Sequence, residues 1–124
     1  MECHIKVQGK VKRKGQPLVR HYTNNMKIPK KIKVAGHIYK IKWDNKRLSD
    51  DGYVGESDHH LDMIYLCRYF KREQPRTDSE IEETFIHEIL HAIDVNYNNH
   101  ALSEKEVTRL AVGLHQVLKD NFNL

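Results

Sequence analysis

The residues with the clearest chemical signature are His87, Glu88 and His91, which stand in the pattern H-E-x-x-H. On a helix, side chains four residues apart lie on the same face, so the two imidazoles can bind one metal ion. Glu88 lies about 100° around the helix from His87, where its carboxylate can reach a metal-bound water without binding the metal itself. This arrangement is typical of zinc-dependent hydrolysis. The competing interpretation is a pair of ordinary core histidines.

The flanking residues predict that this motif lies inside a buried helix. Thr77 can serve as the N-cap, and Glu80 follows three residues later to complete a capping box. Acidic side chains fill the first turns, where the helix dipole favours negative charge. Apolar residues then cover a broad arc of the helix: Phe85, Ile86, Ile89, Leu90, Ala92 and Ile93. A helix with so wide an apolar arc is expected to be buried, so its inward polar side chains need a polar role.

Strand patterns precede the motif. Apolar and polar residues alternate from Cys3 to Val11, and they alternate again on both sides of a short turn at residues 35–37. The segments 53–57 and 61–66 indicate either a further strand pair or one bent strand with a turn at Asp58 and His59, and a run that ends in Gly52 breaks the chain before them. We therefore expect a small antiparallel sheet ahead of the motif helix.

A second helix is predicted after the motif. Ser103 and Glu106 form another capping box, and apolar residues recur beyond it at helical spacing. The expected core face is Val107, Leu110, Ala111, Leu114 and Leu118. Strands followed by helices predict an α+β fold, here a small antiparallel sheet followed by the motif helix and a C-terminal helix. No linker or repeat divides the chain, so residues 1–124 are expected to form one domain.

Composition favours a folded protein of the cytoplasm. The 124 residues suffice for a single hydrophobic core. The two cysteines, Cys3 and Cys67, are too few for a disulfide framework, which favours a reducing compartment. No apolar run approaches membrane-spanning length, and no signal-peptide pattern opens the chain. We therefore expect a cytoplasmic location and no membrane partner.

Basic residues concentrate in the first part of the chain. The net charge is +4, and most Lys and Arg side chains fall between Lys6 and Lys46. Such a stretch can mark a surface for nucleic acid or for another acidic partner. The alternative is a solvated sheet face on which Lys protects an edge strand. No aromatic RNA-binding motif or helix-turn-helix pattern accompanies the charge, which favours the solvated sheet face.

Two histidines leave a catalytic zinc ion one protein ligand short, and the sequence offers several candidates for the third. The pattern H-E-x-x-H-x-x-G-x-x-H does not apply, since Asp94 and Tyr97 stand where it needs Gly and His. His100 lies further along the same segment. Asp94 shares the helix face of the two histidines, which favours a role as hydrogen-bond acceptor for a ligand imidazole. Glu104 and Glu106 both open the next helix, and helical spacing does not separate them.

The motif region also resembles a known family. The segments Glu83–Asp94, Leu102–Ala111 and Gln116–Asn121 are similar to small phage- and prophage-encoded zinc metallopeptidases of minimal zincin fold, and more distantly to ImmA/IrrE-type metallopeptidases. In the ImmA/IrrE-type pattern, a Glu that opens a segment like E-A-N-x-F-A is the third metal ligand. The resemblance assigns that role to Glu106. It implies Zn²⁺ as cofactor, a protein or peptide substrate and the cytoplasm of a bacterial host.

Motif and resemblance together predict a zinc-dependent metallopeptidase. Glu88 would take a proton from zinc-activated water and deliver it to the leaving amine. The candidate donors to the oxyanion are Tyr53, His59, His60, Tyr97 and His100. Zincins often hold a peptide along a sheet edge, for which Asp62–Leu66 is the candidate strand. The alternatives are an inactive or non-peptide binding module of this fold, and a basic nucleic-acid-associated protein with a structural zinc.

Overall fold

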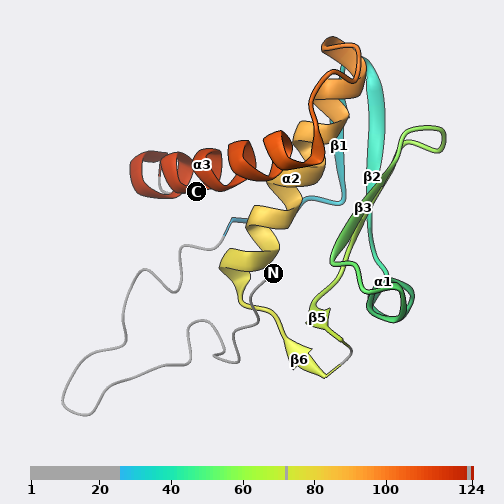
Figure 1. Cartoon of the computed structure of the whole chain (residues 1–124), viewed down its shortest axis with the longest axis vertical. Coiled ribbons are helices and arrows are strands. Elements are labelled where there is room, and N and C mark those ends of the chain that lie inside the picture. Colours follow the sequence, from blue (N-terminus) through green and yellow to red (C-terminus); the bar gives the residue numbers. More distant parts are fainter. Residues whose placement is uncertain (1–25, 72, 123) are drawn as a thin grey trace.

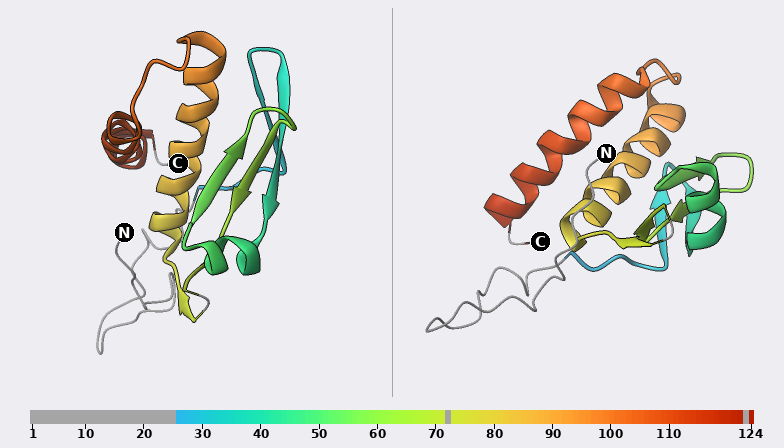
Figure 2. Two further views of the ribbon diagram at one scale, coloured as in Figure 1. Left: turned by 45° about the vertical axis from the view of Figure 1, so that its right-hand side comes forward. Right: turned by 60° about the horizontal axis from the view of Figure 1, so that its bottom comes forward.

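The computed structural model describes residues 26–71, 73–122 and 124. A four-stranded sheet packs on one side of the motif helix α2 (Asp78–Tyr97), and the C-terminal helix α3 (Glu104–Phe122) packs on its other side (Figure 1 and Figure 2). The expected α+β class is confirmed. The strand pattern at Cys3–Val11 lies outside the described residues. Within the described part of the chain, no helix has the length and apolar character needed to cross a membrane.

The sheet is mixed and differs from the fully antiparallel sheet expected. Its strands β1 (Lys31–Val34), β2 (His37–Trp43), β3 (Gly55–Asp58) and β4 (Met63–Leu66) lie in the order β1-β2-β4-β3. The two hairpins are antiparallel, but β2 and β4 pair in parallel. The parallel pairing arises because α1 (Asn45–Asp51) and β3 carry the chain back, so that β4 runs in the direction of β2. Strand β4 therefore lies inside the sheet, and β3 forms one edge, opposite β1.

Local turn chemistry explains the first hairpin but did not reveal α1. The hairpin β1–β2 turns at Ala35 and Gly36, whose φ angles of 52° and 83° are both left-handed, as a two-residue hairpin turn requires. Helix α1 occupies a segment in which the sequence indicated only a break ending in Gly52. Leu48, which is fully buried, anchors this short helix to the rest of the fold.

Helix α2 follows a two-stranded ribbon, β5 (Tyr69–Phe70) and β6 (Gln74–Pro75). Thr77 caps α2: its Oγ1 accepts from the Glu80 N–H at 3.2 Å, and Glu80 Oε1 accepts from the Thr77 N–H at 2.8 Å. The predicted capping box is thus confirmed. The buried core that joins the helix to the sheet is Val34, Tyr39, Ile64, Leu66, Phe85 and Ala92. Full burial of each large apolar side chain contributes about 1.5–3 kcal/mol.

The outward face of the sheet carries much of the basic charge of the described residues. Lys31 and Lys33 on the edge strand β1, and Lys40 and Lys42 on β2, are all exposed. The side chains that alternate with these lysines along both strands point toward the core. This alternation is typical of a sheet with one face in solvent. This arrangement agrees with the interpretation of the basic stretch as a solvated face with Lys on an edge strand.

Helix α3 buries a narrower face than expected. Val107 and Ala111 are buried as predicted, whereas Leu110 and Leu114 are 51% and 40% exposed. His115 is buried in their place. Among the described residues, α2 is the main neighbour of α3 and covers only a narrow strip of its surface, so buried positions recur every four residues along it.

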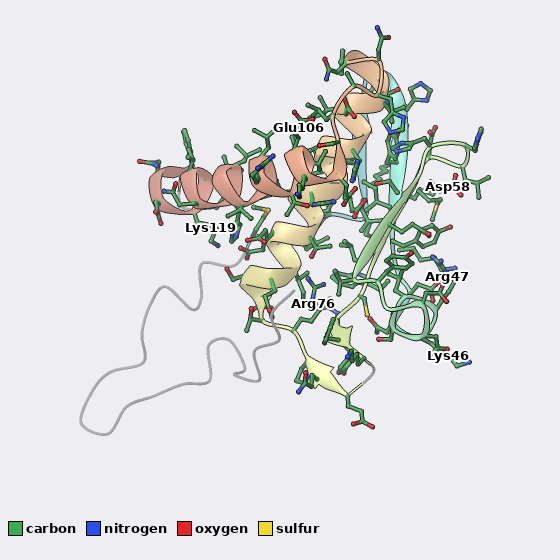
Figure 3. The ribbon with its side chains drawn as sticks, viewed as in Figure 1. Lys46, Arg47, Asp58, Arg76, Glu106 and Lys119 are labelled. Atoms are coloured by element: carbon green, nitrogen blue, oxygen red, sulfur yellow. The ribbon has the colours of Figure 1, made fainter. Side chains whose placement is uncertain are left out.

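The buried carboxylate of Glu82 ties α3 to α2 and to the chain ahead of β1. Glu82 is 2% exposed and accepts hydrogen bonds from His115 Nε2 at 2.9 Å, Lys119 Nζ at 3.2 Å and the Met26 N–H at 2.6 Å (Figure 3 labels Lys119). Burial acts to raise the pKa of Glu82, but the hydrogen bonds from His115 and Met26 and the charge of Lys119 outweigh it and hold the pKa below its usual value. The folded state therefore favours the ionised carboxylate.

We expect Glu82→Gln to lower the free energy of unfolding by about 1–3 kcal/mol near neutral pH, because the charge-assisted network loses its acceptor. The pKa of Glu82 is lower in the folded than in the unfolded chain, so its contribution is fully present above the usual value of 4.5 and is lost as the pH falls below it. Urea unfolding followed by circular dichroism should therefore show a stability difference between wild type and variant that shrinks in acid.

The matched control for this change is Glu83→Gln, which removes one charge from the neighbouring, partly exposed position of α2. This control should change stability by less than about 0.5 kcal/mol near neutral pH. A difference between wild type and Glu82→Gln that stays constant down to about pH 3 would contradict an ionised, stabilising Glu82.

Candidate metal centre

The two motif histidines lie one helical turn apart on α2 and point at a common spot. The Nε2 atoms of His87 and His91 are 3.0 Å apart, and their ring centroids are 4.7 Å apart. Each side chain is 18% exposed, so the imidazoles reach solvent although their helix is packed between two layers. This is the convergence that the four-residue spacing predicted.

The carboxylate of Glu104, at the start of α3, meets both imidazoles. Its Oε1 lies 2.7 Å from His87 Nε2, and its Oε2 lies 2.9 Å from His91 Nε2. Ligand atoms of the three residues all lie within 4.8 Å of one another. The Glu104 side chain is 71% exposed, so the helix start that carries it determines its position more than packing around it does.

Glu106, which the resemblance assigned as the third ligand, lies elsewhere. Its Oε1 accepts from the Ser103 N–H at 2.8 Å, and its own N–H donates to Ser103 Oγ at 3.1 Å, as the capping box predicted. Figure 3 labels it on the first turn of α3. Residues two apart on a helix point about 200° apart, so Glu104 and Glu106 cannot face the same spot. The structure thus places the carboxylate of Glu104, and not that of Glu106, beside the two imidazoles.

Asp94 organises the loop that brings Glu104 to the histidines. It is 1% exposed, and its carboxylate accepts hydrogen bonds from Asn98 Nδ2 at 3.0 Å and from the backbone N–H groups of Ala101 at 3.0 Å and Leu102 at 3.2 Å. Burial acts to raise the pKa of Asp94, but these hydrogen bonds outweigh it and lower the pKa. Its partners are loop groups rather than a ligand imidazole, which corrects the role expected for it.

His91 and Glu104 border a pocket of about 370 Å³. Two sequence candidates do not line it: Tyr97 is 69% exposed at the end of α2, and His100 lies in the loop with a left-handed φ of 53°. His60 is likewise absent from its walls and exposed. The lining consists of Tyr53, Gly55, Glu56, Ser57, His59, Glu88, His91 and Glu104.

Glu88 lines the pocket as a nearly buried carboxyl group. It is 5% exposed, and Ser57 Oγ on β3 donates to its Oε1 at 2.5 Å. Burial, together with the charges of Glu104 and Glu56, raises the pKa of Glu88 to about 7, although the hydrogen bond from Ser57 acts in the opposite direction. A carboxyl group with a pKa near neutrality is suited to accept and release a proton at physiological pH.

The donor set fits a zinc ion. Two imidazole nitrogens and one carboxylate are the ligands of one common class of catalytic zinc site. Nitrogens bound about 2.1 Å from a tetrahedral zinc lie about 3.4 Å apart, and the observed 3.0 Å between the Nε2 atoms needs only small side-chain rotations to reach that value. Burial lowers the pKa of His91, which keeps this imidazole neutral, the form that binds metal.

Strand β3 contributes residues that sequence reasoning missed. A Cβ added at Gly55 would lie 2.5 Å from the Thr84 methyl and 3.0 Å from Glu88 Oε2, so glycine lets the edge strand approach α2 directly. Ser57 lies two residues after Gly55, on the same face of β3, and its hydroxyl reaches the Glu88 carboxylate. A glycine inside a strand pattern often marks such a close backbone approach, and this was the available signal for Gly55. No local signal identified Ser57.

Comparisons of the chain with protein-family models, with curated proteins and with solved structures found no match.

We expect Gly55→Ala to lower the free energy of unfolding by about 1–3 kcal/mol, because the added methyl overpacks the contact between β3 and α2. The control is Gly113→Ala on α3, where an added Cβ meets nothing within 4 Å. That change should leave stability equal or raise it by up to about 1 kcal/mol, since alanine is the better helix former. Urea unfolding of both variants tests the contact, and equal effects would contradict it.

We expect Glu104→Ala to weaken zinc binding by more than about 100-fold, beyond the loss typical of residues that only support a ligand. Glu106→Ala should keep full zinc affinity and lose about 1 kcal/mol of stability through the missing cap. Elemental analysis of protein purified without chelator, together with competition against a zinc indicator, measures both variants. Full zinc affinity in Glu104→Ala would rule out this residue as the third ligand.

Proposed function

We propose that this chain is a zinc-dependent metallopeptidase, which hydrolyses peptide bonds with Glu88 as general base. The observation that carries the proposal is the convergence of His87, His91 and Glu104 beside the buried Glu88. Structural zinc sites are closed by four protein ligands, whereas catalytic sites have three and keep a position for water or substrate. The described residues bring three potential ligands together, which supports the catalytic type.

The chain's own residues supply the proton transfers of such a reaction. A zinc ion held by the three ligands would supply Lewis-acid chemistry at the floor of the pocket. Glu88, with a pKa of about 7, is suited to take a proton from the attacking water and to return it to the leaving amine nitrogen. The hydrogen bond from Ser57 holds one carboxyl oxygen of Glu88 and leaves the other for the proton. Its burial beside Thr84 and Gly55 restricts its motion.

Edge strand β3 supports a peptide as the substrate. It pairs with β4 on one side and has no further strand on its other side among the described residues. Gly55, Glu56 and Ser57 of this strand line the pocket. An extended peptide can add to such an edge through main-chain hydrogen bonds, which would lay a peptide bond across the pocket. We therefore propose β3 as the peptide-binding edge in place of Asp62–Leu66. The strand in that segment, β4, is paired on both sides and offers no free edge.

The remaining alternatives have less support. A structural zinc would not need a buried carboxyl such as Glu88 beside the ligands. For a nucleic-acid-associated protein, the exposed lysines of β1 and β2 would be the binding surface, and none of them lines the pocket. The family resemblance, to small phage-encoded and ImmA/IrrE-type metallopeptidases, stays a prediction from the motif residues, as does a bacterial host cytoplasm.

We expect Glu88→Gln to retain zinc and to lower peptide hydrolysis by about 10²- to 10⁴-fold, because it removes the general base and keeps the shape of the side chain. Cleavage is measured on a diverse synthetic peptide library by mass spectrometry, with zinc-loaded protein. Glu83→Gln is the control and should keep wild-type activity, because Glu83 lies one helical turn before His87 and does not line the pocket. Wild-type protein that cleaves no peptide faster than Glu88→Gln would overturn the proposed function.

A further inference from the structure

His59 faces the same pocket as Glu88 and the metal ligands. It occupies the turn that follows β3, and it lines the pocket together with Glu88, His91 and Glu104. The side chain is partly buried. Tyr39, a core residue of β2 that is 1% exposed, lies behind it, and the two rings meet edge to face with centroids 5.9 Å apart. The imidazole of His59 is therefore supported from within the core.

A chain of hydrogen bonds runs from α2 through Tyr39 to His59. Asn96 Nδ2 lies 2.8 Å from the Ala92 carbonyl oxygen and 3.0 Å from the Tyr39 hydroxyl. The Tyr39 hydroxyl lies 3.0 Å from His59 Nδ1. The chain joins the central helix, the core and the pocket, and its first acceptor is a backbone carbonyl.

The directions of the hydrogen bonds in this chain follow from that carbonyl and from the need of the buried Tyr39 hydroxyl for an acceptor. The Ala92 carbonyl can only accept, so the group of Asn96 that faces it must be the amide NH₂. The second hydrogen of this NH₂ is donated to the Tyr39 oxygen. A hydroxyl oxygen can accept two hydrogen bonds, but if Tyr39 accepted from both neighbours its own hydrogen would have no acceptor among the described residues. The hydroxyl hydrogen is therefore assigned to His59 Nδ1. Nδ1 is therefore the acceptor of the imidazole, and the ring hydrogen is on Nε2.

The ring that results is a neutral donor directed away from the core. Burial, and to a smaller extent the charge of His100, lowers the pKa of His59, while the charges of Asp58 and Asp62 act in the opposite direction. Nε2 lies on the other side of the ring from Nδ1 and so from Tyr39. Among the described residues, no group accepts a hydrogen bond from this Nε2.

We propose that His59 Nε2–H donates a hydrogen bond to the carbonyl oxygen of the scissile peptide bond and stabilises the negative charge that develops there. This inference rests on the proposed peptidase function. The proton stays on Nε2 throughout, and Glu88 carries the proton transfers. Tyr39 and Asn96 are positioning residues, because they act on the substrate only through His59.

The pocket has few other donors for this task. The Ser57 hydroxyl is committed to Glu88, and His91 is a candidate metal ligand. Tyr53 lines the pocket but is 60% exposed, and no hydrogen bond within the described residues holds its hydroxyl. A donor held in place before the reaction stabilises developing charge more than one that must first be ordered. Of the lining donors, His59 is the one whose hydrogen is directed by a buried partner.

The tautomer of His59 is tested first, independently of activity. Zinc-loaded protein labelled with ¹⁵N in histidine is studied by long-range ¹H–¹⁵N correlation spectroscopy, and the His59→Gln variant assigns the resonances. We expect a protonated Nε2 and an unprotonated, accepting Nδ1 in the wild type. Tyr39→Phe, which removes the hydroxyl and keeps the ring, should give a mixture of tautomers. A wild-type ring protonated on Nδ1 would overturn the inference.

The catalytic role is tested on the peptide library with zinc-loaded variants. His59→Ala should lower kcat by about 10²- to 10³-fold and leave KM and zinc content close to those of the wild type. His59→Gln should recover part of the loss, because its amide nitrogen can donate from a similar position, and Tyr39→Phe should lose less than His59→Ala. His37→Ala, which removes an exposed histidine that pairs with Asp62, is the control and should keep wild-type rates.

The outcomes separate the two proposals. If His59→Ala cleaves as fast as the wild type while Glu88→Gln is inactive, the role of His59 is wrong and the peptidase function stands. If the wild type is no faster than Glu88→Gln, the peptidase function fails, and the role of His59 fails with it. If circular dichroism shows that His59→Ala does not fold, His59→Gln and Tyr39→Phe decide the question, because both keep a polar or aromatic group at the site.

Discussion

The structure depends on the burial of α2, a helix with many polar side chains, between the sheet and α3. Unpaired polar groups are costly in such a position, so each needs a partner from a neighbouring element. Glu82 takes its partners from α3 and from the chain ahead of β1, and Glu88 takes its partner from β3. Asp94 is paired with the loop after α2, and Thr84 with the Arg76 side chain. Figure 3 labels Arg76 just ahead of α2. The polar residues of one helix thus determine where its neighbours must pack.

The candidate metal centre combines two ways of positioning a side chain. His87 and His91 take their geometry from the regular turn of a buried helix, which needs no other element. Glu104 is exposed and depends on the loop that the Asp94 carboxylate organises through its backbone hydrogen bonds. The place of Glu104 beside the two imidazoles is therefore determined by a buried carboxylate three residues after the motif, although that carboxylate does not itself approach the imidazoles.

Tyr39 likewise serves both the packing of the core and the positioning of a pocket residue. Its ring fills the core between the sheet and α2, and its hydroxyl joins Asn96 on the helix to His59 on the pocket wall. Because the ring is held by packing and the hydroxyl by a hydrogen bond from the helix, the orientation of His59 is coupled to the core. Pocket residues that lie on a turn are otherwise among the least restrained parts of a fold.

The features predictable from the residue pattern depend on contacts within one element or one turn. They are the capped helix, the shared face of His87 and His91, both capping boxes and the turn between β1 and β2. Helical spacing and capping act within four residues, so the residue pattern specifies them. Tertiary structure alone decided the choice of Glu104 over Glu106, the parallel pairing that makes β3 the edge, the burial of His115, and the link from Tyr39 to His59. These depend on contacts between residues distant in the chain, whose partners a local pattern does not specify.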